Sequence, residues 1–406
     1  MNQQRIINCA LDTVTRFGAS KYPLKNVAQD VIKARKLNSQ ERKALSDIVF
    51  SWSRHRYLIE AYLAERVKSF AALSQHNKES FSINLLAQLY YGFELKMDIN
   101  LVGGYEAYLA QLGDTRWLLA LGPLVHEELI KSLGSDSAKI AKSLWQAPAK
   151  YLAYLPNKIS QESLRLSLGK IGLNITVSPL TARALKIDGS PGKLKLPAHV
   201  WFMDAGSQFI ASLIKPKPGD AVLDMCIGEG GKARIISQYD CVVSGIDIDQ
   251  ARLEKARAVM PGKTNLLCVD AKNSGLKKQS FDWILLDAPC SGSGVIRRHP
   301  DLIHRLTKKD LNSYQALQRD LLKEAANLLK PGGVLIYATC SLFSVENDEQ
   351  ITRLLQANSN LMPLSLKNLV DEHEVLDPLV LNKNSLLLVP HLYDCDAFFV
   401  ASLRRR

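Results

Sequence analysis

Four short apolar runs in the C-terminal half of the sequence each end in an aspartate. The runs are AVLD, CVVSGID, NLLCVD and FDWILLD, and they end at Asp224, Asp247, Asp270 and Asp287. Stretches with helical periodicity separate them, and a further apolar run, GGVLIYATC, follows. This alternation predicts a Rossmann-like α/β domain, a mostly parallel sheet with helices on both faces. Such sheets bind ligands beyond the carboxyl ends of their strands, so the residues after each run are candidates for function.

The rest of the chain is expected to form two further parts. From residue 1 to about 140, apolar residues recur at spacings of three and four, which predicts an all-helical domain with its own core. The next stretch breaks into short segments around prolines and predicts a small connecting α+β subdomain. The expected domains are therefore residues 1–140, 141–200 and 201–406.

Composition narrows the class of partner. Lys and Arg number 52 against 40 Asp and Glu, a net charge of +12 that favours a polyanion such as RNA. The seven cysteines contain no C-x-x-C pair, so we expect neither a disulfide framework nor a metal site. We find no apolar run long enough for a bilayer and no secretory signal, and we expect a cytoplasmic protein without a membrane partner.

A glycine-rich loop, DMCIGEGGKA, begins at the first of the four aspartates. Its glycines would let the backbone approach a ligand closely, and the helix after it would present free amide groups. A glycine turn that merely joins a strand to a helix would look similar. However, Asp247 lies about twenty residues further on, where an acid accepts hydrogen bonds from ribose hydroxyls, and Asp270 is spaced to approach an adenine edge. The pattern favours a cofactor that carries a nucleoside.

Two cysteines follow predicted neighbouring strands. Cys290 stands in DAPCSG, just after Asp287, and Cys340 ends the last apolar run in ATCS. A free cysteine is often only a small buried hydrophobe. Two thiols and an acid beside one another at strand ends instead indicate a reactive site.

These residues resemble motifs of the RNA cytosine-5 methyltransferases of the bacterial Fmu/RsmB type, within the wider family that includes nucleolar protein 2. The resemblance is carried by LDAPCSGSGVIRRHPD at residues 286–301, YATCSLFSVEN at 337–347, GGK at 230–232 and DAFFVASL near the end. It covers about residues 200–404, and the helical region looks like the NusB-type RNA-binding domain that these enzymes often carry.

The resemblance implies a monomeric enzyme that forms 5-methylcytosine in RNA, with 16S ribosomal RNA as the expected substrate and S-adenosylmethionine as the methyl donor. It implies that Cys340 is the nucleophile, that Cys290 helps release the product and that Asp287 contacts the cytosine edge. The implied cofactor-binding residues are Cys226, Ile227, Gly228, Glu229, Gly230, Gly231, Lys232, Asp247, Asp270 and Asp287.

The chemistry of the reaction explains why two thiols are needed. Carbon 5 of cytosine is a poor nucleophile, so a thiolate must first add to carbon 6 and make carbon 5 electron-rich enough to attack the methyl sulfonium. After methyl transfer, a base must remove the proton from carbon 5 so that the enzyme thiol is eliminated. The implied roles of Cys340 and Cys290 follow this order.

Two features leave alternatives open. Arg297, Arg298 and His299 are predicted to clamp RNA phosphates or to stack near a flipped nucleotide, with a solvated surface loop as the alternative. Family members usually have APGGK where this chain has GEGGK, and Glu229 could repel the carboxylate of the cofactor. The rival interpretations are a catalytically impaired RNA-binding or ribosome assembly factor, and a DNA cytosine methyltransferase, which uses the cysteine equivalent to Cys290 as its nucleophile.

Overall fold

The computed structural model describes residues 2–67, 70–91, 99–188, 196–262, 264–370 and 384–406. It divides into two compact units. The first comprises Met1–Gln146 with Ile296–Thr307, and the second comprises Ala147–Val295 with Lys308–Arg406. The segment 296–307 follows the Cys290 loop in sequence but packs with the helical unit.

The first unit is all-helical. Its helices are α1 (Gln3–Gly18), α2 (Leu24–Ala34), α3 (Ser39–Arg66), η1 (Phe70–Ala72), α4 (Gln75–Tyr91), α5 (Ile99–Leu112), α6 (Thr115–Leu119), α7 (Gly122–Leu133), η2 (Gly134–Asp136), α8 (Ser137–Leu144) and α13 (Leu302–Arg305). Helix α3 begins where Asn38 and Glu41 form a reciprocal capping box, which satisfies two backbone donors at the helix start. Its apolar stripe, including Leu45, Ile48 and Trp52, is buried in the core of this unit.

The segment 296–307 is held in the helical unit by specific contacts. Asp301 accepts a hydrogen bond from the backbone N–H of Leu24, which starts α2, at 3.2 Å. His304 hydrogen-bonds the carbonyl oxygen of Ser53 through Nε2 at 2.7 Å, and its ring lies 5.4 Å from the Trp52 ring. Burial lowers the pKa of His304 to about 4, so this ring is neutral at physiological pH.

The second unit begins with a small α+β subdomain. It contains β1 (Lys150–Tyr154), α9 (Gln161–Gly169), β2 (Asn174–Val177), β3 (Leu185–Asp188) and β4 (Val200–Phe202). The strands form an antiparallel sheet in the order β2-β3-β1-β4. Leu164 and Leu168 of α9 pack with Leu152, Leu185 and other residues of the sheet in a core of their own.

The remainder of the second unit is built on a larger mixed sheet. Its strands are β5 (Ala221–Asp224), β6 (Val242–Asp247), β7 (Asn265–Cys268), β8 (Phe281–Asp287), β9 (Leu329–Thr339), β10 (Leu361–Pro363), β11 (Ser385–Leu388) and β12 (Phe398–Arg405). Their order is β10-β12-β9-β8-β5-β6-β7, with β11 also paired to β12. Strands β9, β8, β5, β6 and β7 are parallel, whereas β10, β11 and β12 pair antiparallel.

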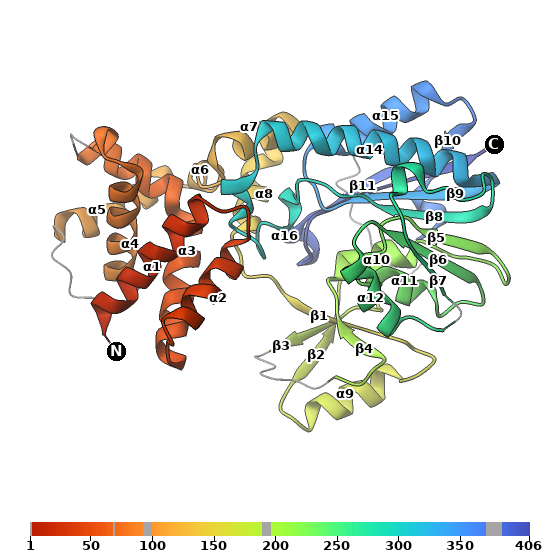
Figure 1. Ribbon diagram of the computed structural model, residues 1–406, viewed down its shortest axis with the longest axis horizontal. Helices are drawn as coiled ribbons and strands as arrows, with labels where there is room; N and C mark the ends of the chain where they lie inside the picture. The colour runs from red at the N-terminus through yellow and green to blue at the C-terminus, as the bar shows by residue number, and fades with distance from the viewer. Residues whose placement is uncertain (1, 68–69, 92–98, 189–195, 263, 371–383) are drawn as a thin grey trace. The chain divides into compact units, whose positions relative to one another are not determined.

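Helices cover both faces of this sheet (Figure 1). They are α10 (Ala205–Ser212), α11 (Gly231–Ile236), α12 (Gln250–Val259), α14 (Lys308–Leu328), α15 (Asp348–Ala357) and α16 (Pro390–Tyr393), with short turns η3 (Ala271–Asn273), η4 (Ser293–Val295), η5 (Ser344–Glu346) and η6 (Leu366–Asn368). Because strand β8 is covered on both sides, its run Trp283–Leu286 is buried without alternation. The predicted fold class, a Rossmann-like sheet preceded by a helical region and a small α+β subdomain, is confirmed.

Candidate active site

The strand order brings several of the predicted residues to one edge of the sheet. Strands β6, β5, β8 and β9 are parallel neighbours, so their carboxyl ends lie side by side. Asp247, Asp224 and Asp287 end the first three, and Cys340 directly follows the fourth. Asp287 is in register with Ala338, two residues before Cys340.

The two thiols lie together at this edge. The Sγ atoms of Cys290 and Cys340 are 3.4 Å apart and share a hydrogen bond. That hydrogen bond, together with burial, raises the pKa of Cys290 well above its ordinary value. Cys290 therefore holds its proton at neutral pH, and Cys340 has a neutral thiol as its neighbour.

A close backbone approach fixes the loop that carries Cys290. The N–H of Gly294 donates to the carbonyl oxygen of Cys340 at 2.9 Å, and its own carbonyl accepts from Ala397 N–H at 3.0 Å. A Cβ atom at residue 294 would collide with the carbonyl oxygens of Ala397 and Cys340, so this position requires glycine. The glycine thus allows the loops after β8 and β9 to meet.

An ion pair lies beside the thiols. Lys232 Nζ, at the start of α11, is 2.5 Å from Asp287 Oδ2. Burial acts to lower the pKa of Lys232, but the carboxylates of Asp287 and Asp224 outweigh it and raise the pKa. Lys232 is therefore a fixed positive charge next to Asp287.

Asp224 is the most buried acid of the strand-end group. It is 2% exposed, and burial raises its pKa to about 7, against the opposing effect of Lys232. Among the described residues, its Oδ1 atom has no hydrogen-bond partner. A buried oxygen of this kind fits a ligand that donates a hydrogen bond or carries a positive charge.

The glycine loop joins β5 to α11 and holds the remaining residues predicted to bind the cofactor. Gly228 and Gly230 have φ angles of +56° and +85°, which favour glycine. Gly228 N–H donates to Asp247 Oδ2 at 2.8 Å, so the loop is tied to the end of β6. Arg252 also lies there, with Nη1 3.7 Å from Asp247 Oδ2. Sequence reasoning missed Arg252, although it stands five residues after a predicted ribose-binding acid.

The structure changes the expected environment of Glu229. Its carboxylate pairs with Lys255 of α12 at 2.6 Å, and both side chains are largely exposed. Its negative charge is therefore partly compensated by Lys255. This pairing reduces the repulsion expected between Glu229 and the carboxylate of the cofactor.

Asp270 lies two residues beyond the end of β7, which stops at Cys268. Its Oδ1 accepts a hydrogen bond from Lys272 N–H at 3.0 Å and caps the turn η3. The opposite oxygen is 3.5 Å from Lys272 Nζ. The acid remains half-buried near the sheet edge, and its contacts with Lys272 were not expected from the sequence.

The three residues predicted to contact RNA fall in the other compact unit. Arg297, Arg298 and His299 belong to the segment that packs with the helical unit. Arg297 is buried, Arg298 half-buried and His299 exposed. Of the three, His299 presents an exposed side chain.

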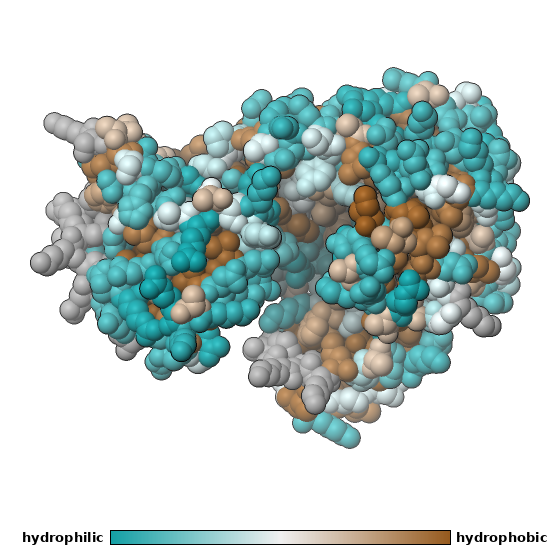
Figure 2. Space-filling view, in the orientation of Figure 1, coloured by the Kyte–Doolittle hydropathy of each residue, from teal (hydrophilic) through white to brown (hydrophobic). Residues whose placement is uncertain are grey.

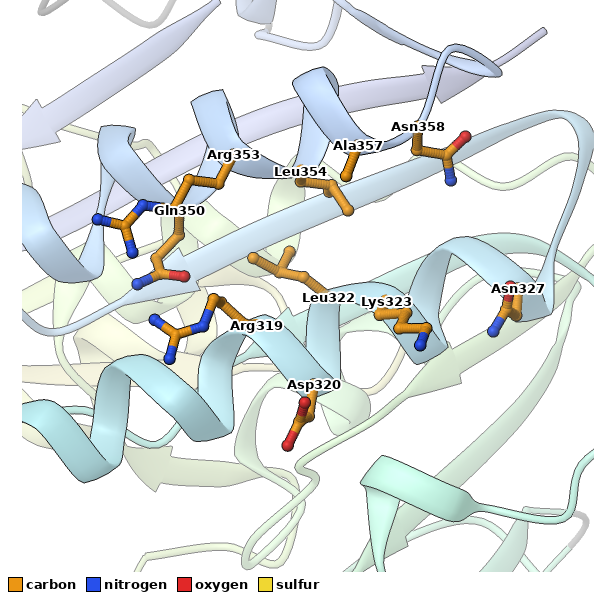
Figure 3. A pocket seen from close by; sticks show the side chains of 10 residues that line it. All are labelled: Arg319, Asp320, Leu322, Lys323, Asn327, Gln350, Arg353, Leu354, Ala357 and Asn358. Carbon is orange, nitrogen blue, oxygen red and sulfur yellow. The ribbon is translucent and has the colours of Figure 1, made fainter.

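Among the described residues, no helix is both long and apolar enough to cross a membrane, and no group of His, Cys, Asp or Glu side chains could hold a metal ion. A cavity of about 510 Å³ lies between α14 and α15, with Arg319, Lys323 and Arg353 in its lining (Figure 3). None of the strand-end residues lines this cavity.

Comparison with known proteins shows what the second half of the chain is similar to. Residues 211–404 match the family model described as 16S rRNA methyltransferase RsmB/F. A probable ribosomal RNA small subunit methyltransferase B from Synechocystis sp. is 31% identical over 276 residues, 64% of this chain and 61% of that protein. The chain spans about half to three fifths of the length of the curated relatives it matches first.

Solved structures agree on the fold. A methyltransferase homolog from Pyrococcus horikoshii is 28% identical, with a TM-score of 0.59 over 72% of this chain and 99% of that one. PH0851 is 21% identical and shares the fold, with a TM-score of 0.73 over 98% of each chain. These likenesses include residues 211–404, the part of the chain that is similar to the RsmB/F family model.

Proposed function

We propose that this protein is an S-adenosylmethionine-dependent RNA cytosine-5 methyltransferase that acts on 16S ribosomal RNA. The observation that carries the proposal is the pair of thiols, Cys290 and Cys340, 3.4 Å apart at the ends of adjacent strands and close to the Lys232–Asp287 ion pair. The names of the matched family and of the relatives support ribosomal RNA as the substrate class.

The residues at the sheet edge fit the proposed cofactor. Asp247 would accept hydrogen bonds from the ribose and Asp270 would approach the adenine. Asp224 offers a buried oxygen without a partner among the described residues, which suits the cationic amino group. When bound, S-adenosylmethionine would supply an electrophilic methyl group. The glycine loop from Cys226 to Lys232 would let the backbone lie against it.

We assign the two thiols to different steps of the reaction. In our proposal Cys340, as a thiolate, adds to carbon 6 of cytosine and forms a sulfur–carbon bond. Asp287, held by Lys232, contacts the polar edge of the base. After carbon 5 has been methylated, a base removes its proton and the bond between Cys340 and carbon 6 breaks, which returns the Cys340 thiolate, with Cys290 assisting this release.

A basic surface of the helical unit supports RNA as the partner. We call it the α2 surface: the exposed residues Lys21, Lys25, Lys33, Arg35, Lys36, Arg42 and Lys43 on α2 and its flanks. Residues 21–43 contain two acids, exposed Asp30 and buried Glu41, so the charge is strongly positive. Tyr22 is 70% exposed beside it and could stack on a base. Figure 2 shows largely hydrophilic side chains over the visible face of this unit.

We further propose that the enzyme acts on ribosomal RNA in the cytoplasm, as a monomer and without a metal ion. Of the predicted RNA contacts, exposed His299 can reach a nucleotide, while Arg297 and Arg298 would contribute charge.

A binding protein without catalysis is the second candidate, because Glu229 departs from the family pattern. Its pairing with Lys255 favours the enzyme instead. Titration calorimetry with S-adenosylmethionine separates the two: we expect binding, and no heat at millimolar ligand would favour an assembly factor.

Bisulfite sequencing of total RNA tests the reaction itself. We expect one or more 16S ribosomal RNA cytosines to be methylated in cells with the gene and unmethylated in cells without it. A complementing copy carrying Cys340→Ala is the matched control and should not restore the signal. Identical methylation maps in all strains would contradict the proposed function.

A further inference from the structure

A fully buried glutamate, Glu346 in η5, lies between the two loops that carry the thiols. Its Oε1 atom accepts a hydrogen bond from the backbone N–H of Ser291 at 2.9 Å. Its Oε2 atom accepts from the hydroxyls of Ser291 and Ser341, each at 2.5 Å. Ser291 directly follows Cys290, and Ser341 directly follows Cys340. One carboxylate therefore binds the neighbours of both thiols.

A third element completes the environment of Glu346. Gln318 of α14 donates through Nε2 to Glu346 Oε1 at 3.1 Å and to the carbonyl oxygen of Pro289 at 2.9 Å. Pro289 directly precedes Cys290, so this contact holds the other side of the same loop. A buried carboxylate is costly unless donors surround it, and here backbone, hydroxyl and amide groups do so.

The backbone of Glu346 is also fixed to the strand before Cys340. Its carbonyl oxygen accepts a hydrogen bond from the Tyr337 hydroxyl in β9 at 2.6 Å. The next residue, Asn347, accepts from Thr339 Oγ1 at 2.6 Å and donates to the Ser341 carbonyl oxygen at 2.9 Å. The carboxylate thus reaches the Cys290 loop from a rigid base on the Cys340 side.

We propose that Glu346 is a positioning residue that sets the separation and orientation of Cys290 and Cys340. Its catalytic consequence rests on the proposed methyltransferase function. If Cys290 is displaced from the adduct, release of the product slows more than formation of the adduct does. Loss of the Glu346 hydrogen bonds is then expected to leave RNA covalently attached for longer, an effect that a general loss of stability would not produce.

The thiol geometry can be measured without RNA or cofactor. Diamide oxidises two adjacent thiols to a disulfide, and mass spectrometry of the linked peptides reports how fast Cys290 and Cys340 become joined. We expect Glu346→Ala to slow this reaction at least tenfold. Glu346→Gln should stay within about threefold of the unsubstituted protein, because the amide oxygen can still accept from Ser291 N–H while the amide nitrogen donates to the two reoriented hydroxyls.

The matched control is Glu349→Ala, which removes a partly exposed glutamate three residues away that pairs with Arg353. It should oxidise at the rate of the unsubstituted protein. If Glu346→Ala does not fold, as judged by circular dichroism, Ser341→Ala becomes the test. This variant removes one hydrogen bond to the carboxylate and should slow disulfide formation several-fold.

The outcomes separate this inference from the proposed function. A folded Glu346→Ala that forms the disulfide at the normal rate would overturn the inference, as would a normal rate in Ser341→Ala if the first variant is unfolded. Slow disulfide formation together with prolonged RNA adducts in Glu346→Ala, rescued by Glu346→Gln, would support it. An unsubstituted protein that forms the disulfide rapidly but never methylates RNA would contradict the proposed function alone.

Discussion

Replacing Asp224 with asparagine is expected to remove the pH dependence of cofactor binding below pH 7. Asp224 is almost fully buried at the end of β5, and burial raises its pKa to about 7. Lys232 opposes this shift, while Asp287 and Asp247 add to it. Below pH 7 the carboxyl group is increasingly protonated and cannot pair with the cationic amino group of S-adenosylmethionine. Affinity should therefore fall as the pH is lowered.

The pKa sets the size of the effect. If the ionised form alone binds, the apparent dissociation constant scales with one plus the ratio of protonated to ionised Asp224. Between pH 7 and pH 5.5 that factor rises about fifteenfold, equivalent to about 1.6 kcal/mol. Both pH values lie below the pKa of an α-amino group, so the amino group of S-adenosylmethionine keeps its positive charge.

Calorimetric titrations at several pH values measure this dependence. Asp224→Asn should bind more weakly at pH 7 and change little at lower pH. Asp240→Asn, which alters an exposed acid at the turn before β6, is the control and should keep the dependence of the unsubstituted protein. A fifteenfold change that persists in Asp224→Asn would refute the assignment of the titration to Asp224, and unchanged affinity at pH 7 would refute its contact with the ligand.

Two further predictions concern the cofactor and the RNA. Asp247→Ala should weaken S-adenosylmethionine binding by about 1 to 3 kcal/mol, because the ribose hydroxyls lose a charged acceptor and Gly228 N–H loses its partner; unchanged affinity in calorimetry would contradict the ribose assignment. Lys33→Gln with Lys36→Gln on the α2 surface should weaken RNA binding and reduce its salt slope by about 1.4 to 1.8, as expected when two phosphate contacts are lost. Lys367→Gln, an exposed lysine of the second unit, is the matched control, and an unaltered slope in the double variant would argue against this surface.

The sequence predicted much of the large sheet because its strands obey a simple rule. Runs such as AVLD and FDWILLD are apolar throughout because helices cover both faces of the sheet, and they end where the chain reaches the polar edge. The prediction was less accurate for the third run, which leaves the sheet at Cys268. Beyond Cys268, the Asp270 side chain bonds to the backbone of a turn and so favours the turn over continued strand pairing. The spacing of apolar residues does not reveal such a side-chain contact.

Contacts between distant segments could not be predicted from the sequence. The motif IRRHPD follows the Cys290 loop in sequence, but its segment packs with the helical unit through Asp301 and His304. Its contact with RNA stays a prediction. A deletion of residues 1–140 would leave the segment 296–307 without its packing partners. Point substitutions on the α2 surface therefore test RNA binding without disturbing that segment. Glu346 likewise stands in the motif SVEN, but its proposed role depends on a hydrogen bond from Ser291, 55 positions away, which the sequence does not reveal.

The strand-end motifs predicted the candidate site more completely than its surroundings. Cys290, Cys340 and Asp287 were each expected at the end of a strand, and the parallel pairing of β8 with β9 brings them together. The roles of these residues stay predictions, because geometry alone does not distinguish the thiol that attacks from the thiol that assists release.

The fate of RNA on two single-thiol variants tests the central claim most directly. Cys340→Ala cannot form the bond to carbon 6, so it should be inactive and form no covalent complex. Cys290→Ala should still form the adduct but release it slowly, with turnover reduced by about 10² to 10⁴, as expected for loss of a group that assists proton removal. On a denaturing gel, Cys290→Ala should show a shifted protein–RNA band that disappears in the double variant. Normal turnover by Cys290→Ala, or trapped RNA on Cys340→Ala, would contradict the account and assign the nucleophile to Cys290.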